Sequence, residues 1–408
     1  MGGEGRVVPL VRLGDVLLGN PRNGYSPKAV AGWTGVQALG LGCLTANGFS
    51  PIQLKNVPNT PLARAALLAD GDLLMSRANT RELVGLVGRY RSTGRPCIYP
   101  DLMMRLRTDE DRCLSEYLEI VLRSTRTRRE VTAGARGTSE SMVKISAELV
   151  KFLEIPLPSV DEQRRIVAAH AAFERRISGL ERVREKLREA ERATSEALLA
   201  RSVGRESVWL GELLADIETG WSPACDSIQP ASDEWGVIKV SAVTSGQFEA
   251  DESKRLPAGL VPRPRIEVRE GDILVARANG ARSLVGAVCQ VGPTRRRLML
   301  SDKILRLVPD TDQAEGAFLP VLLRSVGVRQ QIGNLLNGGT GQNNISQGDV
   351  RGLKVPHVTL GEQRQIIATQ AGWQRRFDAV GKQVEKLRTV QQAVAEDLLG
   401  GREADSVT

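Results

Sequence analysis

The chain has 408 residues, 41% of them hydrophobic and 25% charged, which is enough for two or three domains with packed cores. Its 56 lysines and arginines outnumber its 48 aspartates and glutamates, and the formal net charge of +8 favours a polyanionic partner. Aromatic residues make up only 4% of the chain, so binding that rests mainly on stacking with nucleic-acid bases is not expected.

In chain order, the sequence reads as a globular block, a long helix, a second globular block and a second long helix. The two blocks repeat each other: Gly71–Asn79 matches Gly271–Asn279, and Arg12–Leu17 matches Trp209–Leu214. Further matches keep the same order, and they are Asn23–Pro27 with Thr219–Pro223, Leu83–Gly85 with Leu284–Gly286, Leu122–Ser124 with Leu323–Ser325, and Ile145–Ser146 with Ile345–Ser346. Because the spacing between matches drifts only slightly, insertions are expected in loops while the elements persist.

Each block is predicted to be mixed α/β. Short apolar runs bounded by Gly, Asn or Ser have the length of strands, and they are Asp72 to Met75, Leu83 to Val87 and Gly236 to Val243. Apolar residues recur at helical spacing in Leu114 to Arg126 and in Ala317 to Ile332. The predicted fold class is therefore α/β, in the sense of α+β, with two repeated globular domains that alternate with two long helices.

A polar, glycine-rich loop follows the helical segment of each block and is the best candidate for a functional surface. It spans Asn337–Ser346 in the second block and Ala133–Ser141 in the first. Glycine lets the backbone approach a phosphate closely, while Thr, Gln and Asn side chains bind phosphates or base edges. An ordinary surface turn is the alternative interpretation.

Basic and amide side chains just after a predicted strand form a second candidate surface. Arginine suits guanine edges and phosphates, and asparagine suits adenine edges. A structural salt bridge or a turn cap is the alternative for these positions. Together, the candidate DNA-binding residues are Arg77, Asn79, Arg81, Thr138, Ser139, Arg277, Asn279, Arg282, Thr340, Gln342, Asn343 and Asn344.

A long helix is predicted after each block, the first running to about Leu199 and the second to about Leu399. Prolines precede both helices, as expected because proline lacks a backbone donor and fits outside a helix or in its first turn. Ser159 and Thr359 are candidate N-caps. A glutamate follows each of them three residues later, which is the spacing of a capping box.

Apolar residues in both helices recur with a period near seven, and charged residues fill the remaining faces. This pattern is typical of a coiled coil with a narrow apolar seam, and about 40 residues would give a rod of about 60 Å. Polar residues interrupt the seam at Gln370 and Gln391. The interior glycines Gly179, Gly372 and Gly381 are interpreted as places of close packing against the partner helix. The seam residues are Ile166, Phe173, Ile177, Leu180, Leu187 and Leu198, followed by Ile366, Trp373, Phe377, Val380, Val384, Leu387, Val394 and Leu398.

Signatures of catalysis are missing from the sequence. No phosphate-cradling loop with Gly-Lys-Ser/Thr occurs, and neither His170, at a helix-seam position, nor His357, beside a proline, has a partner constellation. Asn20–Asn23 superficially resembles the Asn-Pro-Pro-aromatic loop of adenine methyltransferases, but it lacks the second proline and the aromatic residue. We therefore expect a non-catalytic protein with no cofactor and no metal.

The cysteines and the chain start bear on the compartment. The five cysteines are scattered, with no close pair typical of a zinc or redox site, so reduced thiols are expected. The start lacks the regions of a signal peptide, and no apolar run is long enough to span a bilayer. The expected location is cytoplasmic, with no membrane partner.

These features together resemble the specificity subunit of a type I restriction–modification system. The resemblance is carried by Ile155–Ile166 and its second copy, by the Gly-Asp-Leu/Ile-Leu segments at Gly71 and Gly271, and by the loop Gly339–Ser346. It covers essentially the whole chain. The implied organisation is a target recognition domain at 1–154, a spacer helix at 155–202, a second target recognition domain at 203–354, a second spacer helix at 355–400 and a tail at 401–408.

The resemblance implies that each target recognition domain reads one half of a split double-stranded DNA site. Adenine methylation and restriction would thereby be directed to an asymmetric bipartite site. The long helices would pair as an antiparallel coiled coil, fix the gap between the half-sites and dock the methylating subunits, two in number, which motor–nuclease subunits would join. The candidate partner-interface residues at the helix starts, for which helix capping is the alternative, are Glu162, Gln163, Arg164, Glu362, Gln363 and Arg364.

The first-half loop departs from the pattern of the second. It has Ser139 and Glu140 where the second half has Gln and Asn, and Glu140 would repel phosphate although a carboxylate accepts from cytosine. The contacts of the first domain are therefore less defined than those of the second, and neither the bases nor the gap length follow from the sequence. Two alternatives of other classes are a non-catalytic coiled-coil scaffold for a protein complex and a fragment of a nuclease–methyltransferase.

Overall fold

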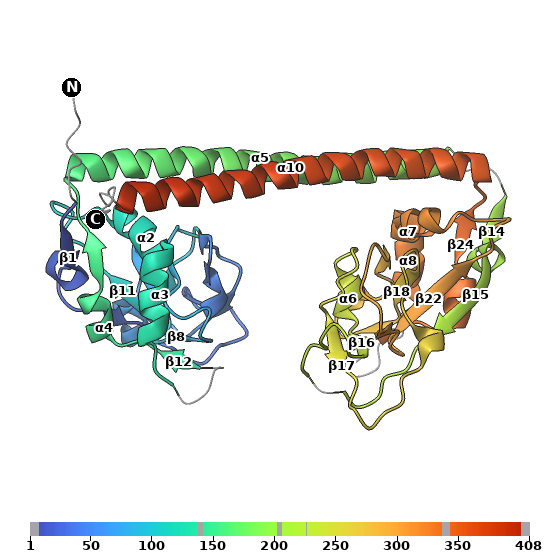
Figure 1. The fold of residues 1–408 in the computed structure, drawn as a ribbon, viewed down its shortest axis with the longest axis horizontal. Helices are drawn as coiled ribbons and strands as arrows, with labels where there is room; N and C mark the ends of the chain where they lie inside the picture. The colour runs from blue at the N-terminus through green and yellow to red at the C-terminus, as the bar shows by residue number, and fades with distance from the viewer. Residues whose placement is uncertain (1–7, 138–141, 202–205, 226, 337–342, 401–408) are drawn as a thin grey trace, which may run out of the picture. The chain divides into compact units, whose positions relative to one another are not determined.

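The computed structural model describes residues 8–137, 142–201, 206–225, 227–336 and 343–400. It divides into two compact units: unit 1 comprises Met1–Glu181 with Lys382–Thr408, and unit 2 comprises Arg182–Gly381. The long helices α5 (Val160–Ala200) and α10 (Leu360–Gly400) therefore each begin in one unit and end in the other (Figure 1). The division at 154/155, 202/203 and 354/355 stays a prediction.

The predicted mixed α/β class is confirmed in both units. Unit 1 contains β1 (Leu10–Arg12), β2 (Arg22–Asn23), β3 (Gln37–Leu39), β4 (Leu44–Thr45), β5 (Gly48–Phe49), β6 (Leu54–Asn56), α1 (Pro61–Ala65), β7 (Leu73–Ser76), β8 (Ala78–Asn79), β9 (Val87–Arg89), β10 (Cys97–Ile98), β11 (Met103–Leu106), α2 (Ser115–Arg123), α3 (Thr125–Gly134), β12 (Val143–Lys144), α4 (Ala147–Phe152) and β13 (Glu154–Pro156).

Unit 2 repeats this order with few changes. It contains β14 (Ser207–Trp209), β15 (Leu214–Thr219), β16 (Gly236–Ile238), α6 (Ser241–Thr244), β17 (Ser253–Arg255), β18 (Ile273–Ala276), β19 (Ala278–Asn279), β20 (Val288–Gln290), β21 (Leu298–Met299), β22 (Ile304–Pro309), α7 (Leu319–Arg324), α8 (Val326–Leu335), β23 (Asn343–Asn344), α9 (Gln347–Arg351) and β24 (Lys354–Pro356).

The sheets of the two units have the same topology. A four-stranded antiparallel sheet has the order β2-β11-β7-β9 in unit 1 and β15-β22-β18-β20 in unit 2. A three-stranded sheet, β10-β3-β6 or β21-β16-β17, contains one parallel pair. The first strand of each block pairs with the strand that leads into the following long helix, β1 with β13 and β14 with β24. This pairing anchors the start of each long helix to its own block.

Four of the predicted elements differ in the structure. The run Leu83 to Val87 is a turn up to Gly85, whose φ of +73° suits glycine, and its strand begins only at Val87. The run Gly236 to Val243 is a strand only to Ile238, and Ser241–Thr244 forms a short helix. The helical segments at 114–126 and 317–332 are each broken in two by an extended serine, which starts a second helix.

Each unit has a larger core beside its four-stranded sheet and a smaller one beside its three-stranded sheet. The ends of the long helices join the larger cores. In unit 1, Ile166 near the start of α5 is buried and Leu399 at the end of α10 packs against the same cluster. In unit 2, Ile366 and Leu199 occupy the equivalent places. Each globular block is therefore built around the start of one long helix and the end of the other.

The glycines of the matched Gly-aromatic-Ser-Pro segments mark a close backbone approach. A Cβ added to Gly24 would lie 2.0 Å from the carbonyl oxygen of Tyr99, and one added to Gly220 would lie 1.9 Å from that of Leu300. No other residue fits at such a distance without moving the backbone. The repetition of this segment is therefore explained by packing within each block.

The predicted starts of the long helices are confirmed by their hydrogen bonds. The backbone N–H of Glu162 donates to the hydroxyl of Ser159 at 3.3 Å, and the N–H of Glu362 donates to that of Thr359 at 3.4 Å. The Glu362 carboxylate in turn accepts from the N–H of Thr359 at 3.0 Å, which completes a capping box. Both helices then run for 41 residues.

The seam of the coiled coil follows the predicted positions. The seam residues are buried or half-buried, with the exception of Leu398, whose side chain is 36% exposed. Within unit 1, His170 of α5 lies beside Gln391 of α10, and Glu181 pairs with Arg388 at 2.7 Å. Because α10 runs backward as α5 advances between these two contacts, the helices are antiparallel.

The interior glycines of the long helices have a different explanation from the predicted one. A Cβ added to Gly179 or Gly381 would meet no atom of the described residues within 4 Å, and at Gly372 it would meet only the tip of Arg375 at 3.9 Å. Close packing against the partner helix is therefore wrong as their explanation, and the structure gives no other reason for them. Among the described helices, none has both the length and the apolar character needed to cross a membrane.

Candidate nucleic-acid interface

Each unit carries a short two-stranded ribbon whose second strand comes directly after the glycine-rich stretch of the sequence. In unit 1, β8 pairs with β12, with Asn79 opposite Val143. In unit 2, β19 pairs with β23, with Asn279 opposite Asn343. The ribbons therefore bring the two predicted surfaces, the residues after the strand and the end of the loop, onto one element. The predicted residues Thr138, Ser139, Thr340 and Gln342 lie outside the described residues.

The asparagines of the ribbons partly serve the backbone. The side-chain oxygen of Asn79 accepts from the N–H of Thr80, and that of Asn279 accepts from the N–H of Ala281, both at 2.9 Å. The Asn343 amide donates to the carbonyl of Gly280 at 3.4 Å, while Asn344 is exposed. Asn79 and Asn279 thus have a turn-capping role, while Asn344 stays accessible for binding.

The candidate arginines are held by carbonyl oxygens of the same unit. Arg77 Nη1 donates to Asp101 O at 3.5 Å. Arg277 Nε donates to Ile345 O at 3.1 Å. Arg81 and Arg282 donate to carbonyls of Thr132 and Gly333, near the ends of α3 and α8. A carbonyl partner orients a guanidinium without neutralising its charge, so the contacts of Arg77, Arg277 and Arg282 are compatible with an added phosphate.

Two further basic residues of unit 1 escaped the sequence reasoning. Arg136 and Lys144 are both exposed and are joined by two backbone hydrogen bonds of 2.9 and 2.8 Å across the ribbon. The sequence contained a signal for Lys144. Because Ile145–Ser146 matches Ile345–Ser346, Lys144 is the counterpart of the candidate residue Asn344 in the repeat. The ribbon of unit 1 therefore carries cations where that of unit 2 carries an amide.

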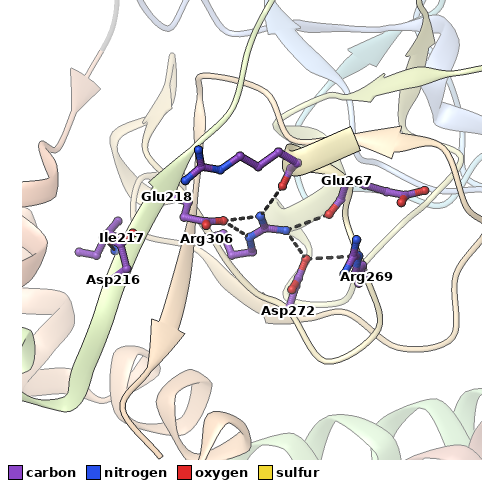
Figure 2. Close-up of polar contacts among 8 residues, drawn as sticks. Asp216, Ile217, Glu218, Glu267, Arg269, Asp272 and Arg306 are labelled. Carbon is purple, nitrogen blue, oxygen red and sulfur yellow. Dashed lines mark hydrogen bonds and ion pairs between the residues drawn. The ribbon is translucent and has the colours of Figure 1, made fainter. Parts of the chain in front are cut away.

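The Gly-Asp segments that repeat in both blocks hold a buried arginine. In unit 2, Arg306 Nη1 donates to Asp272 Oδ2 at 3.0 Å, and Arg306 Nε donates to Glu218 Oε2 at 2.7 Å (Figure 2). The same guanidinium donates to the carbonyls of Glu267 and Arg265. Burial alone lowers the pKa of Arg306, but its hydrogen bonds to the Glu218 and Asp272 carboxylates, together with their negative charges, outweigh burial and raise the pKa. This network joins β15 and β22 of unit 2 to the segment that precedes β18.

Unit 1 has a smaller version of the same network. Arg105 Nη1 donates to Asp72 Oδ2 and to Leu67 O, both at 3.1 Å, and its guanidinium lies over the ring of Tyr99. Arg105 is 9% exposed, like Arg306. The role of the Gly-Asp segments is therefore to stabilise the sheet that carries the ribbon.

The candidate partner residues at the helix starts are of two kinds, buried glutamines and exposed charged residues. The side chain of Gln163 is buried, donating to Arg112 O and Pro158 O and accepting from Leu114 N at 2.8 to 2.9 Å. Gln363 is buried in the same way, with hydrogen bonds to Gln313, Val358 and Glu315. Both glutamines tie a long helix to its own block, so their side chains are not accessible to a partner.

The charged neighbours of these glutamines lie at the surface. The side chains of Arg164 and Arg364 are 66% and 68% exposed, and they pair with Asp161 and Glu315 at 2.9 and 2.7 Å. Glu162 pairs with Arg165 at 3.0 Å. Exposed ion pairs of this kind contribute little to stability, so these side chains could change partners at small cost.

A polar cluster lies in the helix seam of unit 1. The amide of Gln391 donates to Glu174 Oε1 at 2.8 Å and lies 3.1 Å from the Nε2 atom of His170. Burial, and secondarily the positive charge of Arg123, hold the pKa of His170 below its usual value against the opposing effect of Glu174. A polar contact inside a seam favours one register of the two helices.

Acid is expected to destabilise unit 1 through His170. Because its pKa is lowered in the folded state, the unfolded chain takes up this proton first, and stability falls as the pH drops through about 6.5. Denaturant midpoints at pH 7.5 and 5.5 should therefore differ less in a His170→Gln variant than in the wild-type chain. The exposed histidine provides the control, since His357→Gln should leave the difference intact. An equal pH dependence in all three chains would contradict this assignment.

Comparisons with known proteins give a consistent set of relatives. No family model matches the sequence. The specificity subunit of the type I restriction enzyme EcoEI from Escherichia coli is 34% identical over 198 residues, 48% of this chain and 33% of that protein. The StySPI specificity subunit from Salmonella potsdam is 21% identical over 302 residues, 69% of this chain and 63% of that protein. The matched regions thus span less than two thirds of both curated relatives.

A solved structure shows a similar fold. One chain of a type I R-M system, studied for its complex assembly and conformational transition, has 20% sequence identity and a TM-score of 0.55 to this chain. The alignment covers 96% of this chain and 97% of that chain. At this level of identity, the likeness shows the fold alone.

Proposed function

We propose that this chain, which is similar in sequence to type I specificity subunits and in fold to a chain of a type I R-M system, is the DNA-recognition subunit of a type I restriction–modification system. The observation that carries the proposal is the duplication of a polar ribbon on two blocks of the same topology. Two equivalent surfaces on a chain with a net charge of +8 suit two half-sites on double-stranded DNA.

Each ribbon would contact one half of a split site. A two-stranded ribbon fits the major groove, where lysine and arginine favour guanine and asparagine favours adenine. Lys144 and Asn344 occupy equivalent positions, so the two half-sites would differ and the whole site would be asymmetric. The chain itself would be non-catalytic, with methylating subunits and motor–nuclease subunits supplying the chemistry.

Methylome sequencing tests the function directly. Cells with and without this gene would be compared by long-read detection of methyladenine. The expected result is a split, asymmetric motif that is methylated only when the gene is present. A methylome that is unchanged by its removal would contradict the proposal.

The predicted loop residue Gln342 and the ribbon residues Asn343 and Asn344 of unit 2 give a test at residue level. Replacing Gln342, Asn343 and Asn344 together by alanine is expected to weaken binding of the methylating complex to its site at least roughly tenfold, since each good base contact contributes about 1–3 kcal/mol. The loss should fall on one half-site, as shown by competition with duplexes mutated in either half. Unchanged affinity and unchanged methylation would remove the ribbon from the DNA interface.

The exposed residues at the helix starts are proposed as docking points for two methylating subunits, one per unit. Charge reversal at Arg164 and Arg364 is expected to lower the number of methylating subunits bound, measured by native mass spectrometry. The matched controls are Arg175→Glu and Arg375→Glu, which are exposed farther along the same helices. Normal stoichiometry in the Arg164 and Arg364 variants would leave these residues a structural role only.

A further inference from the structure

In each unit, a glutamate near the end of one long helix contacts the first residue of a short helix in the globular block. In unit 2, Oε1 of Glu196 in α5 accepts from the backbone N–H of Val326, the first residue of α8, at 2.7 Å. In unit 1, Oε1 of Glu396 in α10 accepts from the hydroxyl of Thr125, the first residue of α3, at 2.5 Å. The glutamates are equivalent in the repeat, as are the short helices.

The contact is electrostatically favourable for the glutamate carboxylate and for the N-terminus of the short helix. The first turn of a helix has unsatisfied N–H groups and a partial positive charge, which favour a carboxylate. The serine before α8, Ser325, makes no side-chain capping bond, so Glu196 supplies that cap from another element. At the other site, hydrogen bonds from Thr125 and Gln392 lower the pKa of Glu396 and keep it ionised.

Each glutamate bridges a cavity between the block and its helix pair. In unit 2 a cavity of about 1010 Å³ is lined by Ser195, Glu196, Arg324 and Gln370 among others. In unit 1 the equivalent cavity has about 1150 Å³. The leucine three residues after each glutamate packs in the core of the block. The leucine therefore attaches the block to the helix end, and the glutamate adds a second point that limits rotation about it.

We infer that Glu196 and Glu396 are positioning residues that hold each block at one angle on its helix pair and so restrict the protein to one gap length between half-sites. The inference rests on the proposed function. In unit 1 the β8–β12 ribbon lies at the far end of α3 from α10 (Figure 1). Since α3 is about 15 Å long, a tilt of about 10° moves the ribbon by about 3 Å, close to the 3.4 Å of one base-pair step.

The test measures gap preference in the complete complex with methylating subunits. The probes are duplexes with identical half-sites whose gap is native, one base pair shorter or one base pair longer. In a Glu196→Ala/Glu396→Ala chain, the ratio of affinity for the native gap to affinity for the altered gaps is expected to fall roughly tenfold. This is the factor by which the loss of one helix cap shifts an equilibrium. Glutamine at both positions keeps a hydrogen-bond acceptor and should restore most of the preference.

Matched control variants distinguish a role in positioning the blocks from a general effect on stability. Glu189→Ala/Asp397→Ala removes exposed carboxylates from the same two helices and should keep the native preference. Equal weakening at all gaps, or an unchanged ratio of affinities, overturns the positioning role, because a merely structural residue would give either result.

A measurement on the chain alone distinguishes this inference from the proposed function. Hydrogen exchange at the amide of Val326 should speed up in the Glu196→Ala chain, and unchanged exchange overturns the inference whatever the chain binds. If the wild-type complex binds no split site at any gap while exchange at Val326 does speed up, the contact exists but the proposed function is wrong, and the positioning role is overturned with it.

Discussion

Replacing Arg306 by alanine is expected to lower the free energy of unfolding of unit 2 by about 3–5 kcal/mol, the usual cost of removing one partner from a buried ion pair. The side chain of Arg306 is only 10% exposed and bonds two carboxylates and two carbonyls. Its loss would leave Glu218 and Asp272 charged in a poorly hydrated place. Denaturant unfolding followed by tryptophan fluorescence would measure the change, because four of the five tryptophans of the chain lie in unit 2.

Two comparison variants sharpen this test. Arg296→Ala removes an exposed arginine of the same unit and should change the free energy of unfolding by less than about 0.5 kcal/mol. A triple variant, Arg306→Met with Asp272→Asn and Glu218→Gln, removes all three charges and should recover part of the loss. If Arg306→Ala were as mild as Arg296→Ala, the network would not stabilise the sheet.

Lengthening both long helices by one heptad is expected to change the preferred gap of the DNA site. Insertions after Leu180 and Val380 preserve the apolar seam and add about 10 Å, close to three base pairs. Three base pairs also rotate one half-site by roughly 100°, which a left-handed coil does not match over one heptad. We therefore expect weaker binding to the native site, a shift toward a longer gap and lower affinity overall.

Competition between duplexes that differ only in gap length measures this shift. Insertion of a heptad in α5 alone provides a control, because it displaces the antiparallel seam and should impair folding rather than change the preference. Native gap preference at native affinity in the doubly lengthened chain would show that the helices do not set the distance between half-sites.

The repeat and the long helices were predictable because their signals are local or periodic. Ser159 and Thr359 bond a backbone group three residues ahead, so the capping spacing was sufficient to place both helix starts. The seam was predictable from its period, and among its residues only Leu398 is exposed. The Gly-Asp segments identified equivalent strands, although their pattern did not disclose the buried arginine.

Only the tertiary structure decided which candidate side chains are accessible. Gln363 looked like a surface residue at a helix start, yet it is buried because a segment 50 residues earlier supplies its partners. Arg306 bonds Glu218, which lies 88 residues earlier in the chain. The helix that starts after Ser325 is capped by Glu196, which lies 130 residues before Val326. Hydrophobic period and capping spacing record contacts within one or two helical turns. Contacts between distant segments depend on how the whole chain closes, so no local pattern specifies them.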